Sequence, residues 1–207
     1  MPLTTVFLGT PEAAVPTLER LLGSDHHVQA VVTAPDRPRG RGMELAAPPV
    51  KQRAAAAGIP VLQPPSLRTP EAQAELAAAG AGVFVVCAYG LILPPAVLEL
   101  PRLGSVNVHF SLLPAFRGAH AVREALAYGV KVTGCTVHLV DEQVDHGPVL
   151  FQAAVPVEPG DDEDRLHGRI KAEEHRLLPL AVRLLAEGRV RVEGRRARVA
   201  EPEEVPR

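Results

Sequence analysis

The sequence predicts an α/β fold in which an open, mostly parallel sheet is covered by helices on both faces. The first observation is that apolar and β-branched runs recur along the first half of the chain, as in TTVFLG at 4–9, HVQAVVT at 27–33 and GVFVVCA at 82–88. The second is that segments with helical spacing separate these runs. Strands that are apolar throughout are typical of parallel sheets, since helices bury both of their faces.

The helices follow from the spacing of apolar residues and from the residues at their ends. A leucine stripe over 18–22 ends at Gly23, and Thr69 is placed to cap the helix that follows it. A long helix with apolar residues at helical spacing is expected from Glu163 to Glu187. Two further helices are expected at 50–58 and 121–129. Two further strands are expected at 59–63 and 105–110.

The last third of the chain departs from the strand–helix alternation. No helix separates TGCTVHLV at 133–140 from PVLFQAAVPV at 148–157, so these strands are expected to pair antiparallel through the turn DEQVDHG. VRVEGRRARV at 190–199 predicts a C-terminal hairpin, because Glu-Gly-Arg interrupts two β-branched runs. Residues 34–49 are expected to form one long loop.

The composition limits the classes of protein to which the chain can belong. With 207 residues, 46% hydrophobic and 22% charged, the chain is expected to form one domain over 1–200 with a frayed tail at 201–207. A net charge of -2 does not indicate nucleic acid over the whole surface. The two cysteines, Cys87 and Cys135, are too few for a disulfide framework and are expected to be buried thiols. No signal peptide or membrane-spanning run is visible, so a cytoplasmic location without a membrane partner is expected.

The candidate chemistry begins at the end of the strand SVNVHF. Asn107 and His109 are two positions apart, so their side chains share one face of that strand, directly before a loop with Pro114 and Gly118. Asp145, in the turn of VDHGP, could reach the imidazole. An amide, an imidazole and a carboxylate supply an oxyanion donor, a proton carrier and the group that orients it, a set suited to acyl transfer to an amine.

Two other interpretations of these residues were weighed. Ser111 could serve as a nucleophile, but nothing in the sequence indicates a strained turn or a paired base, so direct attack by a bound amine is the more economical route. The other is a metal site built from the nearby histidines and aspartate, whose spacing matches no standard ligand pattern. We therefore expect no metal.

NVHFSLLPAFRG together with VDHGP resembles the folate-dependent formyltransferases, and the resemblance covers nearly the whole chain. It implies a Rossmann-like formyltransferase fold and 10-formyltetrahydrofolate as the formyl donor. By the same resemblance, Asn107, His109 and Asp145 form the catalytic triad, with protonated His109 and Asn107 stabilising the oxyanion and Asp145 raising the imidazole pKa. The implied folate-binding residues are Tyr89, Gly90, Leu91, Ile92, Leu139, Val140, Asp141 and Val144.

The acceptor remains open, because the two halves resemble different subfamilies. Residues 1–118 resemble methionyl-tRNA formyltransferase, whereas residues 121–200 resemble phosphoribosylglycinamide formyltransferase, which formylates glycinamide ribonucleotide. The second resemblance implies acceptor contacts at Gly9, Thr10, Arg68, Gly118 and Glu174. Length favours this small nucleotide substrate of purine biosynthesis, since a second, tRNA-contacting domain would need about a hundred more residues.

Methionyl-tRNA is the close alternative acceptor. Arg37, Arg39 and Arg41 lie in the long loop with no matching acids before Glu44 and could contact phosphates, although a solvated loop explains them equally well. An amino sugar nucleotide is a third candidate. A folate-binding domain without turnover is the alternative from a different class of protein.

Overall fold

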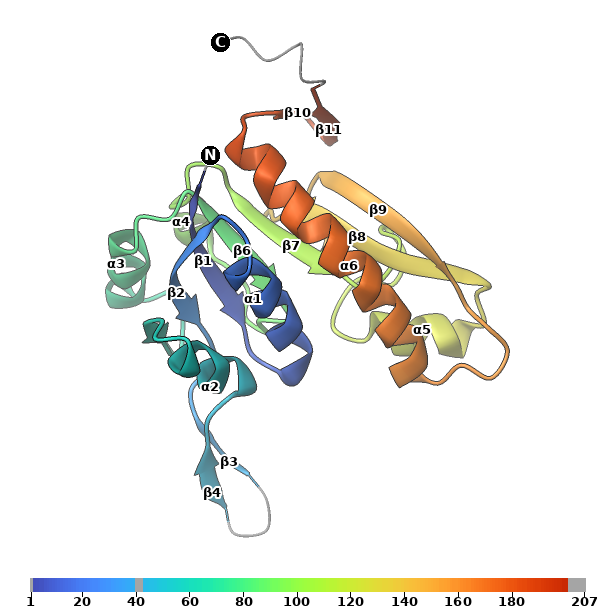
Figure 1. Cartoon of the computed structure of the whole chain (residues 1–207), viewed down its shortest axis with the longest axis horizontal. Coiled ribbons are helices and arrows are strands. Elements are labelled where there is room, and N and C mark those ends of the chain that lie inside the picture. Colours follow the sequence, from blue (N-terminus) through green and yellow to red (C-terminus); the bar gives the residue numbers. More distant parts are fainter. Residues whose placement is uncertain (1, 40–42, 201–207) are drawn as a thin grey trace. The chain divides into compact units, whose positions relative to one another are not determined.

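The structure, a computed structural model, describes residues 2–39 and 43–200 (Figure 1). These residues divide into two compact units, Pro2–Ser105 and a second unit that begins at Val106. The tail expected to fray, 201–207, lies outside the described residues, as does Arg41. Within the described ranges, no helix is long and apolar enough to cross a membrane.

The first unit is a parallel α/β sheet. Its strands are hydrogen-bonded in the order β6-β1-β2-β5, and each neighbouring pair is parallel. β1 and β6 are almost entirely buried, as their unbroken apolar sequences predict. The strands are β1 (Thr4–Gly9), β2 (His27–Val32), β5 (Val61–Leu62) and β6 (Val83–Cys87). The helices are η1 (Glu12–Ala14), α1 (Val15–Leu22), α2 (Pro49–Ala56), α3 (Pro70–Ala78) and α4 (Pro95–Leu98).

A two-stranded arm, β3 (Arg37–Arg39) and β4 (Glu44–Ala46), extends from the first unit (Figure 1). The expectation of a loop over 34–49 was wrong here. Strands of three residues are too short to show alternation, and Pro38 argues against a strand except at an edge. At the base of the arm, Asp36 accepts hydrogen bonds from Lys51 Nζ at 2.7 Å and Gln63 Nε2 at 2.7 Å.

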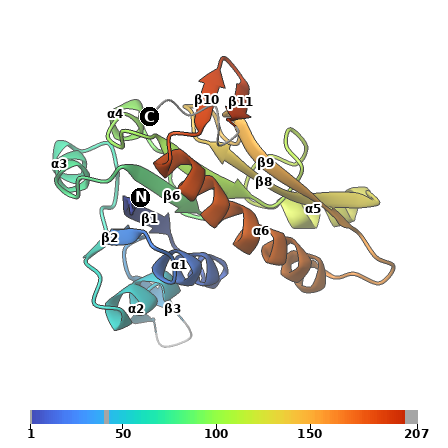
Figure 2. The same cartoon turned by 45° about the horizontal axis from the view of Figure 1, so that its top comes forward.

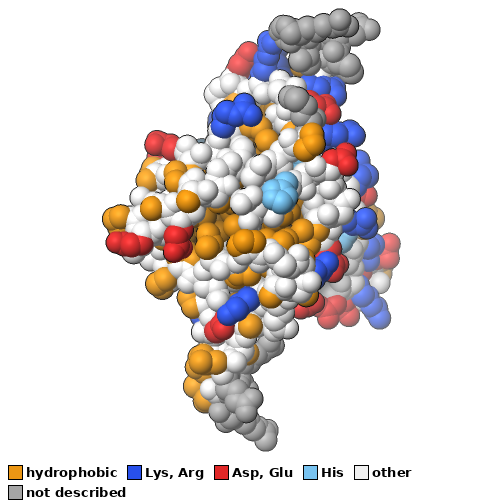
Figure 3. Space-filling model, turned by 60° about the vertical axis from the view of Figure 1, so that its left-hand side comes forward, with side chains coloured by type: hydrophobic (Ala, Val, Ile, Leu, Met, Phe, Trp, Pro, Cys, Tyr) orange, Lys and Arg blue, Asp and Glu red, His pale blue; other side chains and the backbone are white. Residues whose placement is uncertain are grey.

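Hydrophobic side chains lie exposed on this arm. Met43 is 68% exposed and Leu45 is 75% exposed. Hydrophobic side chains are visible at the lower end of Figure 3.

The second unit is built on strands that are mainly antiparallel. The order is β10-β11-β9-β8-β7, and of these pairs only β9–β11 is parallel. The strands β8 and β9 pair antiparallel, which confirms that prediction, and the hairpin β10–β11 is also confirmed. The elements are β7 (Ser105–His109), α5 (Ala121–Tyr128), β8 (Val132–Leu139), β9 (Val149–Pro156), α6 (Glu163–Ala186), β10 (Val190–Glu193) and β11 (Arg196–Val199).

Helix α6 covers one face of the second sheet. It lies along β8 and β9 (Figure 2), and its N-terminus is capped by Asp162, whose side chain accepts from Arg165 N at 2.8 Å. The ring of Phe110 contacts His167 of α6, with centroids 4.5 Å apart. Because side chains alternate along a strand, Asn107 and His109 lie on the face that α6 does not cover.

Candidate active site

The pairing of β7 with β8 fixes the neighbours of both predicted catalytic residues. Asn107 lies opposite His138, and His109 lies opposite Thr136. Directly opposed side chains on one face of an antiparallel pair lie within contact distance. Asn107 Nδ2 accordingly donates to His138 Nε2 at 3.0 Å.

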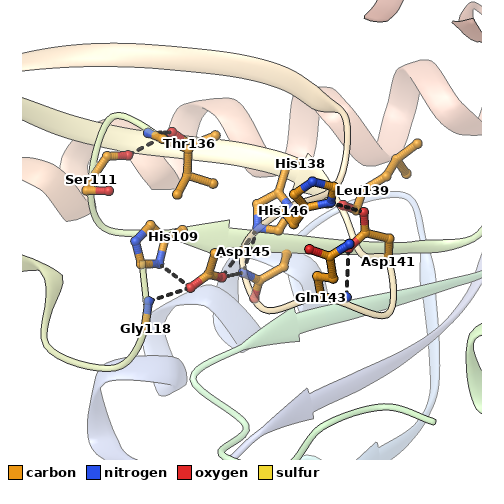
Figure 4. Close-up of polar contacts among 12 residues, drawn as sticks. His109, Ser111, Gly118, Thr136, His138, Leu139, Asp141, Gln143, Asp145 and His146 are labelled. Carbon is orange, nitrogen blue, oxygen red and sulfur yellow. Dashed lines mark hydrogen bonds and ion pairs between the residues drawn. The ribbon is translucent and has the colours of Figure 1, made fainter. Parts of the chain in front are cut away.

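Asp145 lies between these side chains (Figure 4). Its Oδ2 is 3.4 Å from His109 Nδ1 and accepts the backbone N–H of Gly118 at 2.7 Å. Its Oδ1 is 3.4 Å from Asn107 Nδ2 and 3.7 Å from His138 Nε2. The turn between β8 and β9 therefore brings the carboxylate to the amide and the imidazole, the three groups that sequence analysis selected.

The loop after β7 is held rigidly against β8 and β9. Thr136 Oγ1 donates to Ser111 O at 2.7 Å and accepts from Leu113 N at 3.0 Å. Gln152 Nε2 donates to Leu113 O at 2.9 Å. The Ser111 hydroxyl donates to Ala115 O at 2.5 Å, so it supports the loop and is not directed at the catalytic groups.

The hydrogen bonds of His109 place its protons. Its Nε2 is 2.7 Å from the carbonyl oxygen of Phe116, and a carbonyl only accepts, so Nε2 carries a hydrogen. The second proton of an imidazolium would therefore sit on Nδ1, beside Asp145 Oδ2. Phe116 and Asp145 both have positive φ, 50° and 48°, which is costly for a bulky residue such as Phe116 and indicates a conformation imposed by the surroundings.

The pKa values of His109 and Asp145 are both lowered, which favours the neutral form of the imidazole and the charged form of the carboxyl group. Burial lowers the pKa of His109 and outweighs the opposing effects of Asp145 and the Phe116 carbonyl. For Asp145, burial favours the neutral acid, but His138, the charge of protonated His109 and the Gly118 N–H together lower its pKa. The structure thus favours a neutral imidazole beside an ionised carboxylate. Asp145 favours the protonated form of His109, but burial has the larger effect. The protonated His109 that the family resemblance implies is therefore not favoured in this structure.

A pH dependence of stability follows from the lowered pKa of His109. The unfolded chain takes up this proton near the ordinary histidine pKa of 6.5, whereas the folded chain takes it up only at lower pH. We expect the unfolding free energy of the wild type to fall, relative to that of His109→Gln, as the pH drops below about 6.5. Urea unfolding of both proteins at pH 7.5 and pH 5.5 measures this. A difference that is constant, or that grows in favour of the wild type at pH 5.5, contradicts the assignment.

His138 is a site residue to which sequence reasoning gave no catalytic role, since it was considered only as a metal ligand and as part of the pterin-binding segment 138–145. It is 1% exposed, and its Nδ1 donates to Leu139 O at 2.8 Å, which leaves Nε2 of the neutral ring as an acceptor. That acceptor orients the amide of Asn107 by taking one of its hydrogens. The signal that could have found His138 is its register opposite Asn107 on the next strand.

The residues expected to bind the folate fall in both units. Leu139, Val140, Asp141 and Val144 belong to the end of β8 and the loop that carries Asp145, where Val144 is 56% exposed. Tyr89, Gly90, Leu91 and Ile92 follow β6; Tyr89 is buried, which raises its pKa to about 12, whereas Leu91 and Ile92 are exposed. Exposed apolar side chains at strand ends fit a flat aromatic ring.

The residues expected to hold a small nucleotide acceptor in the first unit have structural roles. A Cβ on Gly9 would lie 2.9 Å from Cys87 O, so glycine is required where β1 meets β6. The Thr10 hydroxyl donates to Tyr89 O at 2.9 Å and accepts from Ala34 N at 3.3 Å. Arg68 is exposed on the loop before α3.

The other two expected acceptor residues lie in the second unit. Gly118 gives its N–H to Asp145. Glu174 is fully buried on α6, and burial followed by the charge of Glu174 raises the pKa of Cys135 to about 12. Because Cys135 precedes Thr136, it faces the opposite side of the sheet, so Glu174 is separated by the sheet from His109 and Asp145. The structure does not bring Glu174 to the candidate site.

The alternative of a metal site has no support in the geometry. In the parts of the chain that the structure describes, no group of three His, Cys, Asp or Glu side chains is arranged to hold a metal ion. The histidines of this region are instead hydrogen-bonded to Asn107, to backbone carbonyls and to carboxylates. Their donor atoms are used within the protein.

Comparison with known proteins identifies the family. A model described as formyl transferase matches residues 3–182. The chain belongs to the formyl transferase family. Among relatives of this formyl transferase, the methionyl-tRNA formyltransferase of Hydrogenovibrio crunogenus is 50% identical over 171 residues, covering 83% of the chain and 55% of the relative. That of Aromatoleum aromaticum is 49% identical over 187 residues, covering 90% and 59%.

A solved structure confirms the fold. Glycinamide ribonucleotide transformylase 1 from Symbiobacterium toebii superposes with a TM-score of 0.80 at 35% identity, covering 97% of this formyl transferase and 95% of that chain. The predicted α/β formyltransferase fold with a C-terminal hairpin is therefore confirmed. The chain spans slightly more than half the length of the curated sequence relatives named above.

Proposed function

We propose that this chain transfers a formyl group from 10-formyltetrahydrofolate to the amino group of methionyl-tRNA. The chemistry rests on the placement of Asp145 between Asn107 and His109. The choice of acceptor rests on relatives that are about 50% identical in sequence and are named methionyl-tRNA formyltransferases. This reverses the preference for glycinamide ribonucleotide, which depended on chain length and on the resemblance of the distal half.

The folate supplies an activated formyl group when it is bound. In the second unit, the loop residues Leu139–Val144 are the groups proposed to hold it; Leu91 and Ile92 of the first unit are the residues that the family resemblance implies. The contact between Asn107 Nδ2 and Asp145 is the longer of the two that this amide makes, at 3.4 Å. Asn107 would turn that N–H from Asp145 toward the formyl oxygen and stabilise the negative charge that develops there. Its other N–H stays on His138, so the amide is oriented before the donor binds.

His109 and Asp145 would handle the proton that the attacking amine must lose. The neutral imidazole has its free lone pair on Nδ1, next to Asp145 Oδ2. A proton accepted there is stabilised by the carboxylate and can be passed on to the departing group. The low pKa of His109 keeps the ring ready to accept at neutral pH, and the ionised Asp145 compensates the charge that forms.

The acceptor is tested by offering alternatives in parallel. Purified protein and 10-formyltetrahydrofolate are mixed with methionyl-tRNA or with glycinamide ribonucleotide, and the release of tetrahydrofolate is followed. We expect turnover with methionyl-tRNA. Turnover confined to the ribonucleotide would overturn the acceptor but keep the chemistry, and no turnover with either would overturn both.

The arm β3–β4 is the surface proposed to contact the tRNA. Arg37 is exposed on β3, close in sequence to Arg39, and phosphate contacts contribute a large share of nucleic-acid affinity. We expect Arg37→Ala to raise the KM for methionyl-tRNA by about threefold to tenfold and to reduce the salt dependence of binding by about one charge, with kcat little changed. Arg102→Ala, an exposed arginine elsewhere in the first unit, is the matched control. Equal effects of the two substitutions would contradict a specific role of the arm.

A further inference from the structure

The loop that carries Asp145 has no regular secondary structure, so something else must hold it. Residues 140–147 connect β8 to β9. Within the loop, Asp141 Oδ1 accepts from Gln143 N at 3.0 Å, and Asp141 Oδ2 lies 2.7 Å from His146 Nδ1 (Figure 4). These bonds fold the loop on itself, but they do not tie it to another element.

Besides the bond from Gly118 N to Asp145, a tie to another element comes from the C-terminal hairpin. Arg195 lies in the two-residue turn between β10 and β11, next to Gly194, whose φ of 60° is the conformation that such a turn requires. Its Nη2 donates to the carbonyl oxygen of His146 at 2.7 Å, and its Nη1 lies 2.6 Å from His146 Nε2 and 3.1 Å from His146 Nδ1. Both groups of the guanidinium fork therefore bind one loop residue.

Arg195 contacts both the backbone and the ring of His146. The bond from Nη2 to the His146 carbonyl is charge-assisted. Nη1 lies near both ring nitrogens, so it packs against the imidazole, whose Nδ1 also lies 2.7 Å from Asp141 Oδ2. The guanidinium therefore holds His146 by its backbone and by its ring.

The hairpin is itself anchored. Arg189, at the start of the hairpin, donates from Nε and Nη2 to Ala200 O at 3.1 and 2.9 Å and closes its base. Strand β11 joins β9 through the pair Arg196 and Val149, two residues beyond the end of the loop. The turn that presents Arg195 is thus fixed to the same sheet as the loop that it binds.

We propose that Arg195 is a positioning residue that holds the 140–147 loop so that Asp145 faces His109. His146 follows Asp145 directly, so the bond to the His146 carbonyl limits movement of the backbone one residue after Asp145, whose φ is 48°. Asp145 depends on this placement, because its bonds to Gly118 N and His109 Nδ1 need the carboxylate in one position. The effect of Arg195 on kcat rests on the proposed formyl transfer, whereas its effect on the position of the 140–147 loop does not.

Three variants of the full chain test the proposal. Arg195→Ala removes the fork, Arg195→Lys keeps the charge but not the paired donors, and Arg191→Ala removes an exposed arginine of β10 as the matched control. Hydrogen exchange of residues 140–147 is measured by mass spectrometry, together with kcat and the KM for 10-formyltetrahydrofolate.

For Arg195→Ala we expect exchange in 140–147 to be at least about tenfold faster and kcat to fall by about tenfold, the scale of losing a charge-assisted hydrogen bond. Arg195→Lys should recover part of both effects, and Arg191→Ala should change neither. A merely stabilising role would accelerate exchange over the whole unit and leave kcat of the folded protein unchanged.

The outcomes separate this inference from the proposed function. Unchanged exchange in 140–147 for Arg195→Ala overturns the inference whether or not the wild type shows turnover. Faster exchange with an unchanged kcat also overturns it, because the loop would then not position Asp145. If the wild type transfers no formyl group but the loop loosens in Arg195→Ala, the tie between hairpin and loop stands and the proposed function fails.

Discussion

Asp145→Asn is expected to lower kcat at least about a hundredfold while the protein stays folded, the usual scale for losing the partner of a catalytic base. Asparagine has nearly the same shape, but it removes the charge that compensates a proton on His109 Nδ1. Its NH2 group would take the place either of Oδ2, where it faces the Gly118 N–H, or of Oδ1, where it faces the amide of Asn107, and both of these neighbours are donors.

The measurement is single-turnover formyl transfer across a pH series. Because Asp145 raises the pKa of His109 against the stronger effect of burial, its loss should also move the imidazole titration to lower pH. Asp164→Asn, which removes an exposed carboxylate from the first turn of α6, is the control. A rate for Asp145→Asn within about threefold of the control would show that the carboxylate is not part of the catalytic machinery.

Gly147→Ala is expected to reduce kcat by a similar factor for a purely steric reason. A Cβ on Gly147 would lie 1.8 Å from Leu139 O, so the two ends of the Asp145 loop could not stay as close as they are. Backbone atoms have nowhere to move except by opening the loop, which carries Asp145 away from His109. Strain of this kind also costs stability, on the order of 1–3 kcal/mol.

The matched control is Gly168→Ala, since a Cβ at Gly168 on α6 meets nothing within 4 Å. Removing a glycine from a helix interior should stabilise the protein by about 0.5–1 kcal/mol. Thermal unfolding and kcat are measured for both variants. Normal turnover in Gly147→Ala would mean that the loop can open without displacing the carboxylate.

The elements that could be predicted are those whose apolar residues are regularly spaced or whose ends are marked by characteristic residues. Helix α6 was predicted over 163–187 and is found at Glu163–Ala186, because its apolar residues keep one stripe for the whole length. Strand β1 was predicted at 4–9 and is found there. The arm β3–β4 was missed because its strands contain three residues each, and α4 was missed because it has only four.

The candidate site shows a similar division. Asn107 and His109 can be selected from sequence because two positions on a strand share a face. The Gly118 N–H that holds Asp145 leaves no sequence signal, since every residue except proline has that donor. The position of Glu174 relative to His109 could not be predicted, because similarity to a motif does not say which face of the sheet a helix covers.

The state of the two cysteines has a practical consequence for spectroscopy. Neither Cys87 nor Cys135 forms a disulfide and both are fully buried, and the pKa of Cys135 is raised to about 12, so neither offers a reactive thiolate at neutral pH. A single cysteine introduced on the surface, for example by Arg37→Cys, would be the one fast-reacting thiol. A fluorophore could then be attached to the arm of the native protein without first removing its own cysteines.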